Sequence, residues 1–254
     1  MAEPVATSRQ RTGRAEIYDC MHSRKDYSAE AALVVSLLGR LPARCLDVGC
    51  GTGVHAHALA ALGVTEVVGV DPDPTAIEWA RGRDQPPNAR LRFEVGDISA
   101  SGAGPFDLVT LLFNVVNYVL SEEDLAAVFA HAAALSPSLT AFDAWAPRYE
   151  DQADTTTSIR TFECNGGTYS VETQLRFAPG APDRCRMIRT VVALEHPDEE
   201  VVIEDVALRV WAPAQLAEAA AQAGFDVTAT TWEREFGDLG APGPLDRGLF
   251  LCRL

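Results

Sequence analysis

The sequence predicts an α/β fold in which a doubly wound, mostly parallel sheet carries an antiparallel β insert as a small second lobe. Up to Pro147, short apolar runs alternate with helical segments. This rhythm is typical of right-handed βαβ units, whose parallel strands are covered by helices on both faces. After Pro147, four strand-like runs follow one another with no helix between them, which indicates antiparallel hairpins.

The elements of the parallel part have local signals at their ends. A helix is expected to begin at Ser28, a residue type that caps helix N-termini, and a second capping pattern joins Ser121 to Asp124. Pro74 suits the first turn of a helix. We expect strands at 44–48, 66–70, 91–95, 106–112 and 139–142, and helices from residue 28 onward and over 53–62, 74–83 and 121–135.

In the insert and toward the end of the chain, turn-forming pairs such as Gly166-Gly167 and Pro179-Gly180 separate the expected strands. We expect strands at 158–163, 168–177, 186–194 and 201–210, a helix over 213–223 ended by Gly224, and strands at 226–232 and 248–253. The predicted parts are an N-terminal tail and lid (1–27, its first 15 residues a frayed tail), a ligand-binding core (28–147), an antiparallel substrate lobe (148–210) and a last helix and strands returning to the core (211–254).

Charge and composition exclude several classes of partner. The net charge of −15 disfavours binding to nucleic acid or to an acidic membrane surface. No apolar stretch approaches the ~20 residues that a membrane span needs. The six cysteines have neither Cys-x-x-Cys nor zinc-like spacing, and Cys45 and Cys252 lie in apolar runs, so we expect buried thiols, no metal and a reduced, cytoplasmic compartment. A homodimer is left open.

The strongest motif is CLDVGCGTG, where an apolar strand runs through Asp47 into a turn with Gly49 and Gly51. Glycines allow such a turn to reverse tightly and allow a ligand to lie against bare backbone. A dinucleotide fingerprint would require a third glycine where Val54 stands, and a phosphate loop would require Gly-Lys-Ser/Thr. The loop therefore indicates a different nucleoside ligand at the open end of the sheet.

Two further carboxylates follow the next two strands. Asp71 and Pro72 end the run VVGVD, 20 residues beyond Gly51, where a carboxylate can accept hydrogen bonds from both ribose hydroxyls. Asp97 and Ile98 follow the third strand, where they suit an adenine ring.

With these residues the sequence resembles the class I S-adenosylmethionine-dependent methyltransferases over about residues 44–145: DVGCGTG is similar to their glycine motif, VVGVD to their ribose strand and GDI to their adenine corner. The resemblance implies a Rossmann-like fold with S-adenosyl-L-methionine as cofactor. It also implies that Gly49 and the region of Phe113 hold the methionine end and that Asp47 shapes the loop.

The flanking segments resemble bacterial N,N-dimethyltransferases of nucleotide-linked amino sugars. The similar stretches are Y-D-x-x-H and K-D-Y, from Tyr18 to Tyr27, and the ending R-G-L-F that begins at Arg247. The resemblance adds Tyr18 and Tyr27 to the cofactor site and makes His22 a catalytic candidate. Where that family carries a histidine after the fourth strand, this chain has Tyr118, a poor base at neutral pH that can still position an amine.

We therefore expect an amine-bearing small molecule as acceptor, either a secondary metabolite or a nucleotide amino sugar. His22 and Tyr118 would orient its nitrogen and receive its proton, directly or through water. The predicted substrate residues are Asn114, Asn117, Trp145, Arg148 and Arg247. The alternatives are an O- or C-methyltransferase acting on a natural product and a non-catalytic S-adenosylmethionine-binding module; a nicotinamide oxidoreductase is disfavoured by the missing third glycine.

Overall fold

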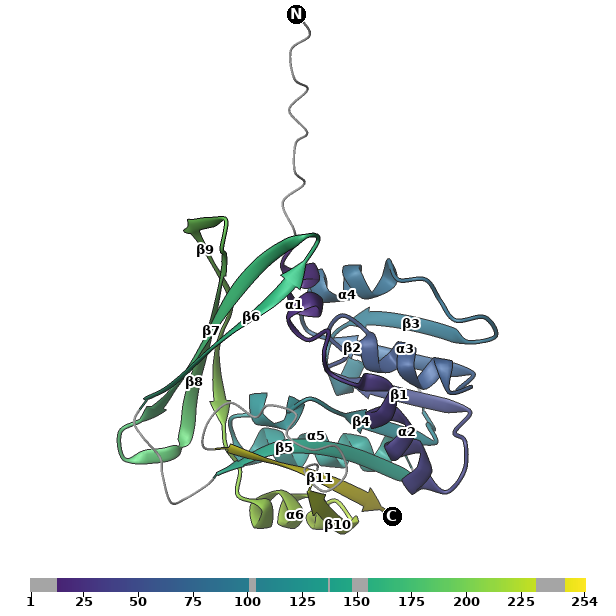
Figure 1. Cartoon of the computed structure of the whole chain (residues 1–254). Helices are drawn as coiled ribbons and strands as arrows, with labels where there is room; N and C mark the ends of the chain where they lie inside the picture. The colour runs from purple at the N-terminus through teal and green to yellow at the C-terminus, as the bar shows by residue number, and fades with distance from the viewer. Residues whose placement is uncertain (1–12, 101–103, 137, 148–154, 232–244) are drawn as a thin grey trace, which may run out of the picture.

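The computed structural model describes residues 13–100, 104–136, 138–147, 155–231 and 245–254. Its described part contains a seven-stranded sheet flanked by helices and a separate four-stranded sheet beside it (Figure 1). The helices are α1 (Arg14–Met21), α2 (Tyr27–Leu38), α3 (Val54–Ala61), α4 (Pro74–Arg81), α5 (Glu122–Leu135) and α6 (Pro213–Gln222). The strands of the large sheet are β1 (Arg44–Val48), β2 (Glu66–Asp71), β3 (Arg90–Val95), β4 (Leu108–Leu111), β5 (Leu139–Pro147), β10 (Asp226–Thr231) and β11 (Leu245–Arg253).

The large sheet has the order β10-β11-β5-β4-β1-β2-β3. Its pairings are parallel except those of β11, which runs antiparallel to both β5 and β10. The chain proceeds from β1 outward to β3 and then returns to β4 on the other side of β1. Such a reversal of strand order opens a crevice at the carboxyl ends of the strands, where ligands bind.

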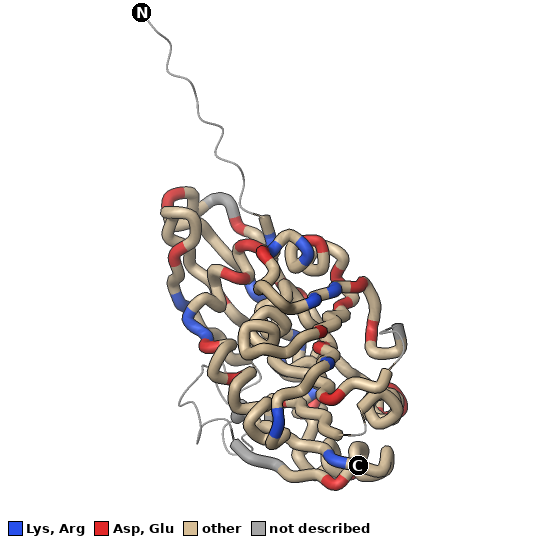
Figure 2. Tube along the Cα trace, turned by 90° about the vertical axis from the view of Figure 1, so that its right-hand side faces the viewer, with Lys and Arg blue, Asp and Glu red and all other residues tan. Residues whose placement is uncertain are grey.

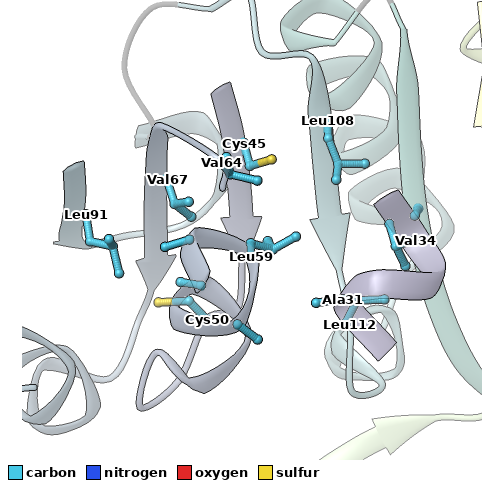
Figure 3. Close-up of a cluster of buried hydrophobic side chains, with 14 of the residues drawn as sticks. Ala31, Val34, Cys45, Cys50, Leu59, Val64, Val67, Leu91, Leu108 and Leu112 are labelled. Atoms are coloured by element: carbon cyan, nitrogen blue, oxygen red, sulfur yellow. The ribbon is translucent and has the colours of Figure 1, made fainter. Parts of the chain in front are cut away.

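Alternating side chains of the parallel strands pack against helices on opposite faces. Cys45 belongs to the cluster with α2, α3 and α4, which Figure 3 shows with Val34, Leu59 and Val67. Leu46, the next residue, belongs to the cluster on the face covered by α5 and α6. The predicted doubly wound sheet is confirmed, because the strands bury side chains on both faces.

The second sheet consists of β6 (Thr155–Cys164), β7 (Gly167–Ala178), β8 (Ala181–Ala193) and β9 (His196–Arg209), paired antiparallel in that order. These strands are longer than the sequence predicts, and the same holds for β5. One part of this sheet packs with Trp145 of β5, through Met187 and Leu208, and so lies against the core. The antiparallel insert is therefore confirmed as a second layer beside the ligand crevice.

Helix α1 is absent from the sequence-based prediction, which treats the first 15 residues as a frayed tail; residues 1–12 lie outside the described part. The helix begins at Arg14 and buries Ile17 and Met21 against the second sheet. Its eight residues include only a narrow apolar stripe, which explains why periodicity did not reveal it. In Figure 1 it lies between the second sheet and α4.

The cap of α2 also differs from the prediction. Asp26, not Ser28, is the N-cap, because its Oδ1 accepts a hydrogen bond of 2.9 Å from the backbone N–H of Ala29. Asp and Ser are equally good caps, so sequence alone did not separate them. The predicted cap at Ser121 is confirmed, and Gly224 follows α6 with a φ of +95°.

The charged residues are spread along the trace and are not gathered on one element (Figure 2). Among the described helices, none is both long and apolar enough to cross a membrane.

The expectation of six thiols is wrong for Cys20 and Cys164, which form a disulfide between α1 and β6. The partners are 144 positions apart, so no spacing rule connects them. Cys45, Cys50, Cys185 and Cys252 are free and buried, as predicted for Cys45 and Cys252.

We predict that Cys164→Ser lowers the free energy of unfolding by about 2–4 kcal/mol, because the disulfide closes a long loop in the unfolded chain. Denaturant unfolding measures this difference. A reductant should lower the native chain to the stability of the variant and leave the variant unchanged. Equal stabilities of the oxidised native chain and the variant would contradict the bond.

Candidate functional site

The glycine loop after β1 has the backbone that its sequence requires. Gly49 and Gly51 have φ angles of +67° and +53°, a region that favours glycine. The N–H groups of Gly49 and Cys50 donate to the Val70 carbonyl at 2.8 and 3.0 Å. A Cβ on Gly49 would lie 2.5 Å from Cγ2 of Val115, whereas a Cβ on Gly51 would meet nothing within 4 Å. The loop is therefore packed on one side and open above Gly51.

Asp71 links this loop to the end of β2. Its Oδ2 accepts from the Gly51 N–H at 2.8 Å, and its Oδ1 accepts from the Asp73 N–H at 2.9 Å. Each carboxylate oxygen has a second acceptor position, so the group can still receive two hydroxyl donors. Desolvation raises the pKa of Asp71, while the two backbone N–H groups lower it. Pro72 lies exposed beside it.

Asp47 lies beneath the loop and is 2% exposed. Its Oδ1 accepts a hydrogen bond of 2.8 Å from the Thr110 hydroxyl, and its buried Oδ2 has no partner among the described residues. Burial raises the pKa of this carboxyl group. A buried oxygen without a donor is costly, so the position suits a ligand that supplies one.

Asp97 and Ile98 follow β3, beside the end of β2. The Oδ1 of Asp97 accepts from the Ser99 N–H at 2.8 Å, which fixes the carboxylate after the strand, and the Ile98 side chain is buried. The three strand ends marked by Asp47, Asp71 and Asp97 are adjacent in the sheet, as the sequence predicts.

The segment after β4 is the most strained part of the site. Phe113 and Asn114 have φ angles of +70° and +66°, which non-glycine residues rarely adopt. The buried Asp143 of β5 accepts hydrogen bonds from the N–H groups of both residues, with a Phe113 distance of 3.0 Å. Sequence analysis missed Asp143, because nothing local in β5 reveals a partner 30 residues earlier. Strain held in this way is common at functional sites.

A small cavity with a volume of about 10 Å³, room for about one water molecule, lies between this segment and the second sheet. Its lining combines residues that the sequence predicts for cofactor, substrate or catalysis with residues of β8 and β9 that it does not. The lining residues are Tyr18, Phe113, Asn114, Asn117, Tyr118, Trp145, Met187, Arg189 and Leu208.

Asn117 is buried in the wall of this cavity. Both its amide nitrogen and its amide oxygen form hydrogen bonds with backbone groups. Its amide donates to the carbonyls of Arg209 and Trp145 at 2.8 and 3.3 Å, and its oxygen accepts from the Trp145 N–H at 2.9 Å. The side chain thereby joins β5 to β9. Its predicted role at the substrate site remains a prediction, and its contacts favour shaping the wall over contacting a ligand.

The Tyr118 hydroxyl contacts an ion pair of the second sheet. The hydroxyl donates to Oε1 of Glu204 at 3.2 Å, and Glu204 is paired with Arg189. Desolvation and the Glu204 carboxylate raise the pKa of Tyr118, and also that of Tyr18, so both remain neutral phenols. Sequence analysis considered Arg189 only as a possible partner of substrate phosphates and missed Glu204, because antiparallel pairing brings the two together only in the fold.

The N-terminal motif residues surround Phe113. His22 is 8% exposed, and its ring lies 4.7 Å from the ring of Tyr18 and 4.9 Å from that of Phe113. Tyr27 lies 6.5 Å from Phe113 between ring centroids. Sequence analysis assigns Tyr18, Tyr27 and Phe113 to the cofactor site and His22 to catalysis, and the structure brings their rings together.

A buried ionic cluster lies next to these rings and is another feature that sequence analysis missed. Glu30, with no exposed surface, pairs with Lys25 and lies 2.7 Å from Nε2 of His55. Lys25 also lies over the ring of Tyr27, 4.2 Å from its centroid. The cluster connects the K-D-Y segment to the helix that follows the glycine loop.

Asp19 fixes α1 above the glycine loop. Its carboxylate accepts hydrogen bonds from the Thr52 hydroxyl, from Nε1 of Trp79 at 2.7 Å and from the Arg83 guanidinium. With the disulfide at Cys20, adjacent residues of α1 bind the core and the second sheet. The predicted lid segment thus contains a helix attached on both sides.

Two predicted substrate residues are not placed in the site. Arg148 lies outside the described residues, and Arg247 pairs with Trp145 in the register of β11 and β5, with no description of its side chain. Within the described residues, no group of three or more His, Cys, Asp or Glu side chains could hold a metal ion.

Residues 45–137, which include the glycine loop, the strand-end carboxylates and the segment after β4, match the family model of a methyltransferase domain. The chain is 38% identical over 89 residues to a magnesium-protoporphyrin O-methyltransferase of Rhodobacter capsulatus, covering 32% of this chain and 39% of that protein. It is 36% identical over 127 residues to a dTDP-3-amino-3,6-dideoxy-alpha-D-glucopyranose N,N-dimethyltransferase of Streptomyces fradiae, covering 47% and 48%. The chain spans less than half the length of these curated relatives.

Solved structures cover nearly the whole chain. DesVI of Streptomyces venezuelae aligns with a TM-score of 0.75 and 25% identity over 96% of this chain and 99% of its own. CalS10, described as an amino pentose methyltransferase from Micromonospora echinaspora with bound SAM, aligns with a TM-score of 0.73, 23% identity, and coverage of 94% and 97%. The predicted methyltransferase domain is confirmed over residues 45–137, and the predicted Rossmann-like fold is confirmed.

We predict that Asp19→Asn loosens α1 from the core and lowers the free energy of unfolding by about 1–2 kcal/mol, because the carboxylate accepts three donors in a partly exposed position. Hydrogen exchange of the amides in Arg14–Met21 should accelerate. Asp26→Asn is the matched control, since Asn caps helices as well as Asp. Unchanged exchange in Asp19→Asn would contradict the attachment.

Proposed function

Because residues 45–137 carry a methyltransferase domain, we propose that this chain binds S-adenosylmethionine at the glycine loop and transfers its methyl group to an amine of a small-molecule acceptor. The observation that carries the proposal is the position of the open face above Gly51, bordered by the carboxylates of Asp47 and Asp71. The acceptor cavity at Phe113 and Asn114 lies on the neighbouring strand end.

The residues present fit the cofactor. Asp71 retains two acceptor positions for a ribose, and the unpaired Oδ2 of Asp47 suits a ligand donor such as an ammonium group. Asp97 and Ile98 would border the adenine, as Pro72 would the ribose. Gly49, Phe113, Tyr18 and Tyr27 would enclose the methionine end, and α1 would exclude water from the site.

Bound S-adenosylmethionine would supply an electrophilic methyl group on a positively charged sulfur. The acceptor nitrogen would take this methyl group with its lone pair, the electrons of the broken carbon–sulfur bond would remain on sulfur, and the product ammonium would release a proton to water. The protein's task is to hold the nitrogen in line and to exclude water, which can supply much of the acceleration. Tyr118, which lines the cavity, and His22, whose ring contacts the ring of Phe113 in the cavity wall, would orient that nitrogen.

The acceptor class is supported by two kinds of observation. An amine needs neither a metal nor a strong base, whereas a hydroxyl or carbon acid usually needs one of them. The relative of Streptomyces fradiae is named for an amino sugar linked to dTDP, so a nucleotide amino sugar is the acceptor we favour. Arg148 and Arg247 would pair with its phosphates, and Trp145 would form the pocket wall.

An O-methyltransferase is the second candidate, because the relative of Rhodobacter capsulatus has that activity in its name. Each of these two matches covers less than half of this chain, so neither relative determines the acceptor atom. The two neutral phenols of the cavity, Tyr18 and Tyr118, are poor bases, which favours an amine as the acceptor.

We predict that calorimetry detects saturable binding of S-adenosylmethionine and its demethylated product and none of NAD. Asp71→Asn should weaken this binding roughly tenfold to a hundredfold, because one ribose hydroxyl loses its charged acceptor. Asp73→Asn is the control, since the Asp73 side chain caps α4 and the substitution keeps the backbone N–H that contacts Asp71. An unchanged dissociation constant in folded Asp71→Asn would refute the assignment.

We predict that methyl transfer to dTDP-3-amino-3,6-dideoxy-α-D-glucopyranose accelerates from neutral pH to about pH 9 as the amine loses its proton. Because the pKa values of Tyr18 and Tyr118 are raised, neither phenol titrates in this pH range. Initial rates with methyl-labelled cofactor measure the profile. Tyr118→Phe should lower the rate without moving the midpoint. A midpoint that moved in this variant would assign the titration to Tyr118 and not to the amine.

A further inference from the structure

The second sheet contributes a buried ion pair to the cavity. Arg189 of β8 and Glu204 of β9 face each other in register and are 7% and 8% exposed. Buried ion pairs give little net stability, and hydrophobic replacements are often at least as stable. Stabilisation of the fold therefore does not explain why this buried ion pair is present. Its position next to Tyr118 indicates a role at the cavity.

The pair determines the hydrogen-bond polarity of Tyr118. A carboxylate only accepts, so the Tyr118 hydroxyl must donate its single hydrogen to Oε1 of Glu204, at 3.2 Å. The guanidinium of Arg189, which only donates, holds the other oxygen of Glu204 in place. Tyr118 therefore presents only lone pairs to the cavity that it lines. The residue as a whole is 45% exposed, whereas burial of its hydroxyl raises the pKa of the phenol.

Asn114 adds a second acceptor to the same cavity. Its Oδ1 is buried and has no hydrogen-bond partner among the described residues, and its backbone is fixed by Asp143. A buried, unpaired acceptor is expected to find its donor in a ligand. The cavity thus offers two acceptors, Oη of Tyr118 and Oδ1 of Asn114, beside one unpaired donor, Nε of Arg189.

We propose that Glu204 and Arg189 are positioning residues that make Tyr118 a hydrogen-bond acceptor, so that Tyr118 and Asn114 together hold the two N–H groups of a primary amine. This inference rests on the proposed methyl transfer and narrows its acceptor. A neutral primary amine has two hydrogens and one lone pair, so two acceptors hold both hydrogens and leave the lone pair for bond formation. A hydroxyl has a single hydrogen and satisfies only one of the two.

The test measures kcat, KM for the amine and cofactor affinity in three variants: Glu204→Gln, Tyr118→Phe and the double variant. A glutamine can either donate to the Tyr118 oxygen or accept from it, so the polarity of the hydroxyl is no longer fixed. We expect each single variant to lose about tenfold in kcat, as for one lost hydrogen bond, with an unchanged dissociation constant for S-adenosylmethionine. Because Glu204 acts through Tyr118, the double variant should be no slower than Tyr118→Phe.

Asp205→Asn is the matched control. Asp205 follows Glu204 in β9 and pairs with Arg186 of β8 at 2.6 and 2.7 Å, but this pair is exposed on the other face of the sheet. Its kcat should remain within about twofold of native, as for a surface pair. If Glu204→Gln leaves a buried charge that prevents folding, Glu204→Gln with Arg189→Gln removes that charge and should show the same loss.

The probes are dTDP-3-amino-3,6-dideoxy-α-D-glucopyranose and its 3-hydroxy counterpart. Transfer to the amine alone, with non-additive variants, supports the inference. Native kcat in Glu204→Gln, additive losses in the double variant, or transfer to the hydroxyl at a similar rate overturns the inference while the proposed methyl transfer stands. Failure of the native chain to methylate any amine of a broad panel counts against the proposed function itself and removes the inference with it.

Discussion

The Asp143 carboxylate, bound to the N–H groups of Phe113 and Asn114, holds the segment on which both halves of the site depend. It supports two consecutive residues with positive φ, which would otherwise cost free energy. Phe113 faces the rings of the N-terminal motif, and Asn114 faces the acceptor cavity. Val115, next in the chain, fills the space that only a glycine at position 49 leaves free. One buried carboxylate, that of Asp143, thus fixes the position of the glycine loop relative to the cavity.

The second layer of the site is built by long-range contacts. Asn117 joins the core strand β5 to β9, and Tyr118 contacts Glu204 on the same strand of the second sheet. On the other side, α1 connects the sheets through Asp19 and Cys20. The cavity is therefore enclosed by elements that are held together by contacts between residues far apart in the sequence.

The local sequence predicts the parallel core well, because glycine turns, strand-end carboxylates and caps are encoded within a few residues. Gly49, Gly51 and Asp71 lie where their motif indicates. Partners brought together by pairing in the second sheet, such as Arg189 and Glu204, have no local signal, and neither does Cys20 with Cys164. Helix α1 was missed because its stability comes from packing against that sheet and not from its own periodicity.

The central claim is that a nitrogen of a small acceptor receives the methyl group from S-adenosylmethionine. Carbon-13 spectroscopy of the product formed with cofactor labelled in the methyl carbon identifies the atom to which that carbon is bonded. The account predicts a labelled carbon coupled to nitrogen when the acceptor amine carries nitrogen-15. A labelled carbon on oxygen or carbon, from an acceptor that retains its amine unmodified, would contradict it.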